Sequence, residues 1–308
     1  MTIPIVLVTG FLGSGKTSLL RHWAGRYAAR RLVYLVNEFS AVDVDAAELQ
    51  RVTPDVVSLP GGSIFCRCLI SEFLDRLALL PERFAAPGRP IEAVIVEASG
   101  MANPSTADRL LRESGLDLVY DLRRIVALAD PGSFRKLLRT LPAIRDQVAA
   151  ADLVVLNKTD RYPEADVAAT ERAILDVRPG APIVRTTFGR IDLDLPPPAG
   201  ARTSDGEYAT CADPRFAREA VRVDGEVDLA AFRAAVDAVA DDVYRLKGRV
   251  RSGGAMRHVE FSASGWDVSD EAAPGEPELV FILRGADHAG ADRVVADLRA
   301  GRFAPPPR

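Results

Sequence analysis

The first segment whose residue types could do chemistry is Gly10–Thr17, with the sequence GFLGSGKT. It fits the pattern G-x-x-x-x-G-K-[ST], in which glycines let the backbone curl so that its amides point at phosphate oxygens. Lys16 can reach the β- and γ-phosphates of a nucleotide, and Thr17 can hold Mg²⁺. The alternative is a glycine turn that binds nothing. The positions expected to bind phosphate, together with the dipole of the following helix, are Gly10, Gly13, Ser14, Gly15, Lys16, Thr17 and Ser18.

A second polar segment, Asn157–Asp160 (NKTD), follows the apolar run Leu153–Leu156. An aspartate here can accept hydrogen bonds from N1–H and the 2-amino group of guanine. Adenine offers neither donor, so Asp160 is expected to select GTP. Asn157 can brace the N7 side of the purine, and Lys158 can lie over the base or tie down the first loop. The alternative is an ordinary polar loop. An ATP-dependent kinase would share the first segment but would leave this one without a role.

Apolar runs recur along the first 190 residues, with helical spacing between them. Runs that are apolar throughout suit strands buried on both faces of a parallel sheet. Strands that alternate with helices predict an α/β fold, a P-loop NTPase domain whose mostly parallel sheet is sandwiched by helices. The expected strands are residues 3–9, 32–36, 93–96, 125–129, 153–156 and 183–186, and the expected helices are residues 18–29, 72–80, 105–113 and 165–176.

The composition changes after about Gly189, which predicts a second domain. A segment rich in Pro, Gly, Ser and Thr suits a linker. Beyond it, an order of β-α-β-β-β-α predicts a small C-terminal α+β domain. Its expected strands are residues 220–223, 243–250, 257–263 and 278–283, and its expected helices are 228–240 and 288–300. We therefore expect a GTPase domain at 1–190, a linker at 191–214 and a C-terminal domain at 215–308.

Length, charge and cysteine content limit the class of protein. The 308 residues suffice for two domains, and the net charge of −4 argues against a broad nucleic-acid surface. The first apolar run has no basic flank or cleavage site and is too short to span a bilayer. Cys66, Cys68 and Cys211 suit a reduced thiol site better than a disulfide framework. We expect a cytoplasmic protein that binds neither nucleic acid nor membranes, as a monomer or a nucleotide-dependent dimer.

These motifs together resemble those of the CobW-like family of P-loop GTPases, in the wider group that also holds the urease and hydrogenase nickel-insertion GTPases. The resemblance spans nearly the whole chain. It implies a GTPase domain joined to a small regulatory domain, and better-understood members look like metallochaperones that deliver Zn²⁺ or cobalt to client enzymes. The segments that carry it are Gly10–Leu20, Asn37–Phe39, Glu97–Pro104, Asn157–Asp160 and Tyr244–Gly248 (YRLKG), the last similar to the family's R-x-K-G strand.

Two glutamates are candidates for the chemistry of GTP hydrolysis. Glu97 follows an apolar run and could hold the Mg²⁺ shell or orient the attacking water; the alternative is a strand-end acid facing solvent. Asn37–Phe39 resembles the family's first switch region, which makes Glu38 the second candidate, although Ser40 stands where glycine is expected. Hydrolysis needs mainly positioning and charge neutralisation, so Lys16, Mg²⁺ and one such acid would suffice. We expect slow intrinsic turnover that a partner accelerates.

The stretch that matches the family's G-C-x-C-C metal motif departs from it. Ser63 and Phe65 stand where the first two cysteines are expected. Cys66 matches the third, and Cys68 is an addition two residues on. A thiolate triad suits a tightly held tetrahedral ion, and a hydroxyl and a phenyl ring cannot replace two thiolates. Cys66 and Cys68 could still hold Zn²⁺ or Co²⁺ with an oxygen ligand from Glu38; the alternative is that both cysteines only pack at a helix start.

The leading hypothesis is a GTP-dependent chaperone that delivers a metal to a client metalloenzyme or activates it. GTP and Mg²⁺ would order the switch region, and hydrolysis would reset it. The degraded cysteine motif favours an alternative: a non-metal guanine-nucleotide switch that gates or repairs a cofactor-dependent client, such as a corrinoid enzyme.

Overall fold

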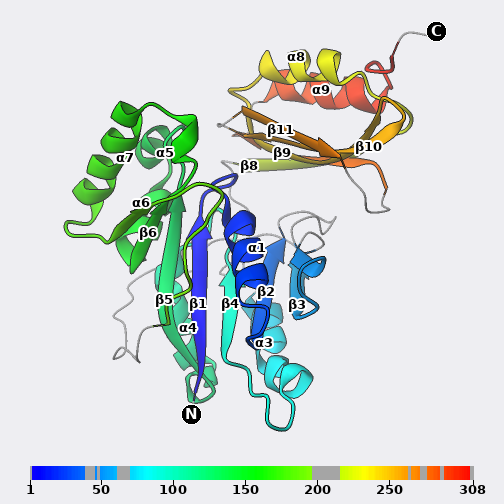
Figure 1. Ribbon diagram of the computed structural model, residues 1–308. Helices are drawn as coiled ribbons and strands as arrows, with labels where there is room; N and C mark the ends of the chain where they lie inside the picture. Colours follow the sequence, from blue (N-terminus) through cyan, green and yellow to red (C-terminus); the bar gives the residue numbers. More distant parts are fainter. Residues whose placement is uncertain are drawn as a thin grey trace. The chain divides into compact units, whose positions relative to one another are not determined.

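The computed structural model describes residues 2–38, 46, 49–60, 70–195, 216–262, 265–270, 276–284 and 288–305 (Figure 1). The chain divides into two units, Met1–Cys211 and Ala212–Arg308. The predicted linker at 191–214 lies mostly outside the described residues, so the domain boundaries given above remain a prediction. In the described part of the chain, no helix combines the length and the apolar character that crossing a bilayer requires.

One parallel sheet of seven strands forms the centre of the first unit. Its strand order is β3-β2-β4-β1-β5-β6-β7, and neighbouring strands run parallel throughout. This confirms the parallel α/β fold expected from the unbroken apolar runs. The strands are β1 (Ile3–Gly10), β2 (Leu32–Glu38), β3 (Val56–Pro60), β4 (Ala93–Glu97), β5 (Tyr120–Ala129), β6 (Leu153–Leu156) and β7 (Ile183–Arg185).

Helices cover both faces of this sheet. Leu19, Leu20 and Trp23 of α1 pack against one face in a buried cluster, whereas α4 contacts β5 and α6 contacts β1 and β5. Figure 1 shows α1 in front of the strands and α4 behind them. Both sets of alternating strand side chains are therefore buried. The helices are α1 (Lys16–Arg26), α3 (Ile70–Phe84), α4 (Ala107–Glu113), α5 (Phe134–Thr140), α6 (Pro142–Ala150) and α7 (Glu164–Val177), with 3₁₀ turns η1 (Pro104–Thr106), η2 (Leu116–Leu118) and η3 (Thr159–Arg161).

The register places the carboxyl ends of the strands at one edge of the sheet. Glu97, the last residue of β4, lies in register with Val8 of β1 and with Val36 of β2. On the other side of β1, Gly10 pairs with Leu128 of β5. Because β1 is the strand at which the order changes direction, this edge is where open α/β sheets bind their ligands.

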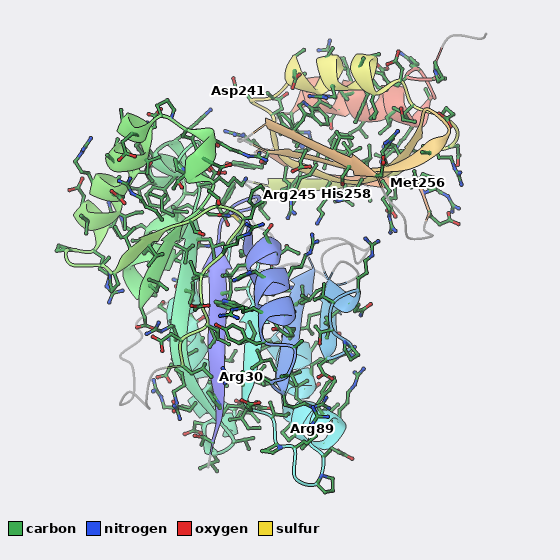
Figure 2. The ribbon with its side chains drawn as sticks, viewed as in Figure 1. Arg30, Arg89, Asp241, Arg245, Met256 and His258 are labelled. Atoms are coloured by element: carbon green, nitrogen blue, oxygen red, sulfur yellow. The ribbon has the colours of Figure 1, made fainter. Side chains whose placement is uncertain are left out.

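The second unit is an antiparallel sheet of five strands with two helices. The strand order is β11-β10-β9-β12-β8. Phe232 of α8 and Val294 of α9 pack with strand residues such as Phe281, so both helices lie on one face of the sheet. Figure 2 shows Arg245, Met256 and His258 on the side of the sheet away from these helices. The elements are β8 (Phe216–Arg222), α8 (Leu229–Asp237), β9 (Val243–Ser252), β10 (Ala255–Ser262), β11 (Gly265–Asp270), β12 (Glu278–Arg284) and α9 (Ala289–Arg299).

This unit has one strand more than the expected β-α-β-β-β-α order. The additional strand, β11, is a sheet edge that pairs only with β10. In this strand only Trp266 and Val268 are large apolar residues, and they alternate with polar ones. This pattern is a weak sequence signal for a strand, because an edge strand needs little apolar surface. The glycine of the YRLKG segment has a steric role: a Cβ at Gly248 would lie 2.0 Å from the carbonyl oxygen of Glu278.

Candidate nucleotide site

The loop between β1 and α1 has the backbone shape that the phosphate-binding prediction requires. Gly10, Gly13 and Gly15 have φ angles of 137°, 76° and 102°, values that residues with side chains rarely adopt. Gly15 caps α1 in a left-handed conformation, without a side-chain cap and without an acidic residue in the first turn. The amides at this helix start are therefore available to an anion, and the dipole favours one.

Lys16 lies folded back over this loop. Its side chain is buried, with 6% of the residue exposed, and its Nζ donates to the carbonyl oxygens of Gly10 at 2.9 Å and of Phe11 at 3.4 Å. The positive charge is thus held at the carbonyl oxygens of the loop whose amides are expected to bind phosphate oxygens, and a charged donor strengthens such binding.

Asn157 joins the two predicted halves of the site. Its Nδ2 donates to the carbonyl oxygen of Ser14 at 2.9 Å, and its Oδ1 accepts from the amide of Gly189 at 2.9 Å. The residue is 1% exposed, at the end of β6. The N-K-x-D box therefore contacts the phosphate loop directly, across 143 residues of sequence. Nδ2 carries two hydrogens and the bond to Ser14 uses one of them, so the expected contact with N7 of the purine stays a prediction.

Lys158 forms an ion pair with a residue that the sequence analysis did not single out. Its Nζ lies 3.0 Å from Oδ2 of Asp130, and Oδ1 of Asp130 accepts from the amide of Gly132 at 2.9 Å. Asp130 is buried and directly follows β5, as Asn157 follows β6. The position of Asp130 directly after an apolar run is the sequence signal that could have identified it as a site residue. The pair fixes Lys158, whose own φ is 59°.

Asp160 lies exposed in the short turn η3. Its carboxylate makes no hydrogen bond or ion pair with the residues that the structure describes. Thr159 secures the turn: its amide and its Oγ1 donate to the carbonyl oxygen of Thr186, at 3.3 Å and 3.2 Å. An acceptor that is held in place and open to solvent suits the two guanine donors that the prediction assigns to it.

Glu97 closes β4 and is buried, with 4% of the residue exposed. Nearby oxygens at the same edge are buried without a hydrogen-bond partner in the described part of the chain: Oγ1 of Thr9, Oγ of Ser14 and Oδ1 of Asn37. Buried oxygens of this kind need a donor or a cation. With Thr17 on the first turn of α1, they form an oxygen-rich surround of the kind that Mg²⁺ and a nucleotide fit.

The segment after Glu97 is in contact with the phosphate loop and is tied to α6. A Cβ at Gly100 would lie 2.7 Å from the amide nitrogen of Leu12, so only glycine allows this approach. Nε2 of the buried Gln147 donates to the carbonyl oxygens of Gly100 at 3.1 Å and of Ala102 at 3.2 Å. One residue earlier, Asp146 accepts from Nδ2 of Asn103 at 3.1 Å, and burial raises its pKa.

The predicted transition-metal ligands fall where the structure gives no side-chain information. Cys66 and Cys68 lie outside the described residues, and Glu38, the last residue of β2, is described only in its backbone. Within the ranges that the structure covers, no group of three His, Cys, Asp or Glu side chains could hold a metal ion. The transition-metal site therefore stays a prediction from the sequence.

Replacing Gly15 with alanine is expected to destabilise the first unit and to disturb the nucleotide site. The added Cβ would lie 2.2 Å from Nδ2 of Asn157, so the bond between Asn157 and Ser14 must break. Loss of a buried hydrogen bond costs about 1–3 kcal/mol, beyond the cost of the left-handed backbone. Thermal unfolding measures the effect. Gly88→Ala is the matched control, because Gly88 also has a positive φ but no atom within 4 Å of its Cβ position; equal losses would contradict the clash.

Comparisons with known proteins find matches to both units of the chain. Residues 4–185 match the family model "CobW/HypB/UreG, nucleotide-binding domain", and residues 217–300 match "Cobalamin synthesis protein cobW C-terminal domain". The zinc chaperone YjiA of Escherichia coli K12 is 30% identical over 194 residues, which cover 63% of this chain and 60% of YjiA. Zinc-regulated GTPase metalloprotein activator 1 of Schizosaccharomyces pombe is 29% identical over 226 residues, covering 67% of this chain and 52% of that protein.

A solved structure of Zn(II)-bound YjiA GTPase from E. coli aligns with 97% of this chain and 99% of that one, at 20% identity and a TM-score of 0.48. The matched region spans between about half and three fifths of the length of these curated relatives. The match to the nucleotide-binding domain covers more than half of the chain. The chain therefore belongs to the CobW/HypB/UreG family of nucleotide-binding proteins.

Proposed function

We propose that this protein binds GTP with Mg²⁺, hydrolyses it to GDP and phosphate, and uses the cycle to deliver a metal to a client metalloenzyme or to activate that client. The observation that carries the nucleotide part is the Asn157 bridge, which joins the phosphate loop to the N-K-x-D box at one edge of the sheet. Asp160 is open to solvent beside this bridge, ready to accept from guanine. The client is a partner that the residues do not identify.

In this proposal the glycine-shaped loop and Lys16 bind the phosphates. Thr17 and Glu97 are the residues that would hold Mg²⁺, and the ion would supply neutralisation of the phosphate charge. Glu97 or Glu38 orients the attacking water. Because few protein groups take part in bond making, intrinsic turnover is slow and a partner accelerates it.

The segment that follows Glu97 supports a switch. Gly100 lies against Leu12 of the phosphate loop, and Gln147 of α6 binds the carbonyl oxygens on either side of Met101. A change at the γ-phosphate can therefore reach α6 through a few direct contacts.

The proposed delivery of a metal is supported by observations other than those for nucleotide binding. Relatives of this chain are named zinc chaperones and a metalloprotein activator. Cys66, Cys68 and Glu38 are the proposed ligands for Zn²⁺ or Co²⁺. The second candidate function, a guanine-nucleotide switch without a metal cargo, is favoured by Ser63 and Phe65, which occupy the positions of two motif cysteines.

Metal titration separates the two candidates. Reduced protein is analysed for its metal content and titrated with Zn²⁺ and Co²⁺, as wild type and as Cys66→Ala, with Cys211→Ala as the matched control. Metal delivery predicts tight binding that is lost in Cys66→Ala and kept in Cys211→Ala, because a thiolate ligand cannot be replaced by a methyl group. Weak binding that is equal in all three proteins would favour the switch without a metal.

A further inference from the structure

Phe188 is a large apolar residue that is held exposed on a strained backbone. The residue is 58% exposed, and its φ is 54°. Among the described residues, only Lys158 and Phe188 combine a positive φ with a side chain. Such conformations are costly for bulky residues and gather at functional sites. Lys158 belongs to the N-K-x-D box. The other strained residue, Phe188, is therefore a candidate for a role at the same site.

Hydrogen bonds on both sides of Phe188 fix it beside that box. On the amino-terminal side, the amide of Thr186 donates to the carbonyl oxygen of Leu156 at 2.9 Å, and Thr159 binds the carbonyl oxygen of Thr186. On the carboxyl-terminal side, the amide of Gly189 donates to Oδ1 of Asn157. Phe188 therefore lies between Thr186 and Gly189, two residues that both contact the base-reading segment Asn157–Asp160.

The loop that carries Phe188 is also held by two helices. Arg185, at the end of β7, pairs through its guanidinium with Glu164 and Glu171 of α7. A Cβ at Gly189 would lie 2.8 Å from the backbone of Leu19, so the loop packs directly on α1, the helix whose start belongs to the phosphate site. The guanidinium of Arg190 lies 5.6 Å from the centroid of the Phe188 ring, a favourable cation–π distance.

We propose that Phe188 is the stacking residue of the guanine pocket and that its ring lies on one face of the purine. The inference rests on the proposed function, since it requires a nucleotide at this site. A flat apolar ring in solvent loses exposed area when it covers a base, and stacking tolerates any purine because every base has a π-face. In this arrangement Asp160 selects guanine through the two donors of the base. Phe188 adds affinity for any purine and does not discriminate between them.

The test uses Phe188→Gly and Phe188→Trp in the full chain, with GDP and inosine diphosphate as ligands in calorimetric titrations. Glycine accepts a positive φ without strain, so Phe188→Gly removes the ring without lowering the thermal midpoint. We expect it to weaken the binding of both nucleotides about 5- to 150-fold, the range for loss of one base–aromatic stack, and to leave the ratio of their affinities unchanged. Phe188→Trp should restore affinity, and the emission of the new Trp should change when GDP binds.

Leu118→Ala serves as the control, because Leu118 is 83% exposed but lies in η2, beside the amino-terminal end of β1. It should bind both nucleotides as wild type does. If wild type binds GDP and Phe188→Gly binds it equally well, the stacking role is wrong while the nucleotide site stands. If wild type binds neither nucleotide, the proposed function itself fails. A change in the ratio of GDP to inosine diphosphate affinity would show that Phe188 reads the 2-amino group, which also overturns the inference.

Discussion

Replacing Lys16 with alanine is expected to lower the single-turnover rate of GTP hydrolysis by about 100-fold or more, the usual cost of removing one positioned charge-stabilising donor. The Nζ of Lys16 lies at hydrogen-bond distance from the carbonyl oxygen of Gly10, above the loop that would hold the phosphates. As negative charge shifts toward the leaving oxygen, this ammonium stabilises it, and alanine cannot. Quenched-flow measurement of phosphate release, with enzyme in excess over GTP, isolates the chemical step.

The matched control is Lys136→Ala, which removes an exposed lysine from α5. It should hydrolyse GTP at the wild-type rate. Lys16→Ala should remain folded, because the methyl group fits where the longer side chain lay. An unchanged rate in Lys16→Ala would remove the phosphate loop from the mechanism.

Replacing Asp160 with asparagine is expected to weaken GTP binding by about 10²- to 10⁴-fold, since two hydrogen bonds to a charged acceptor are lost at about 1.5–3 kcal/mol each. The same change should strengthen the binding of xanthosine triphosphate, whose O2 can accept from the new amide. Because Asp160 is exposed, the substitution leaves no buried group without a partner, and folding should not change. Calorimetric titration with both nucleotides gives the ratio.

Asp176→Asn makes the same chemical change at an exposed position near the end of α7 and should leave both affinities at the wild-type values. A ratio of GTP to xanthosine triphosphate affinity that stays constant in Asp160→Asn would exclude this carboxylate from base recognition.

The sequence predicted the interior strands well and the edge strands unevenly. β1, β4, β6 and the part of β5 at residues 125–129 are mostly buried on both faces, so their residues are almost all apolar and leave a continuous signal. Of the four edge strands, β3 and β11 were not predicted, whereas β7 and β8 were expected at residues 183–186 and 220–223. An edge strand is stabilised by pairing with one neighbour, and that pairing is not visible in its own residues. The helices α5 and α6 were also missed; they are short and meet at Leu141–Pro142.

In the candidate site, the sequence could identify residues whose role is encoded in a local motif. Glycine spacing around Lys16 is one such signal, because backbone shape depends on adjacent residues. Asp130, Gln147 and Gly189 were missed because their partners lie far along the chain: Gln147 binds the carbonyl oxygen of Gly100, 47 residues away. Contacts of this kind can be predicted only when the strand order of the sheet is known.

Competition between nucleotides tests most directly whether this site selects guanine. Wild-type protein is loaded with a fluorescent GDP analogue in the presence of Mg²⁺, and GTP or ATP is titrated against it. Since ATP offers Asp160 neither of the donors that guanine presents, displacement should require at least about 100-fold more ATP than GTP. Equal displacement by the two nucleotides would contradict the assignment of Asp160 and, with it, the proposed GTPase.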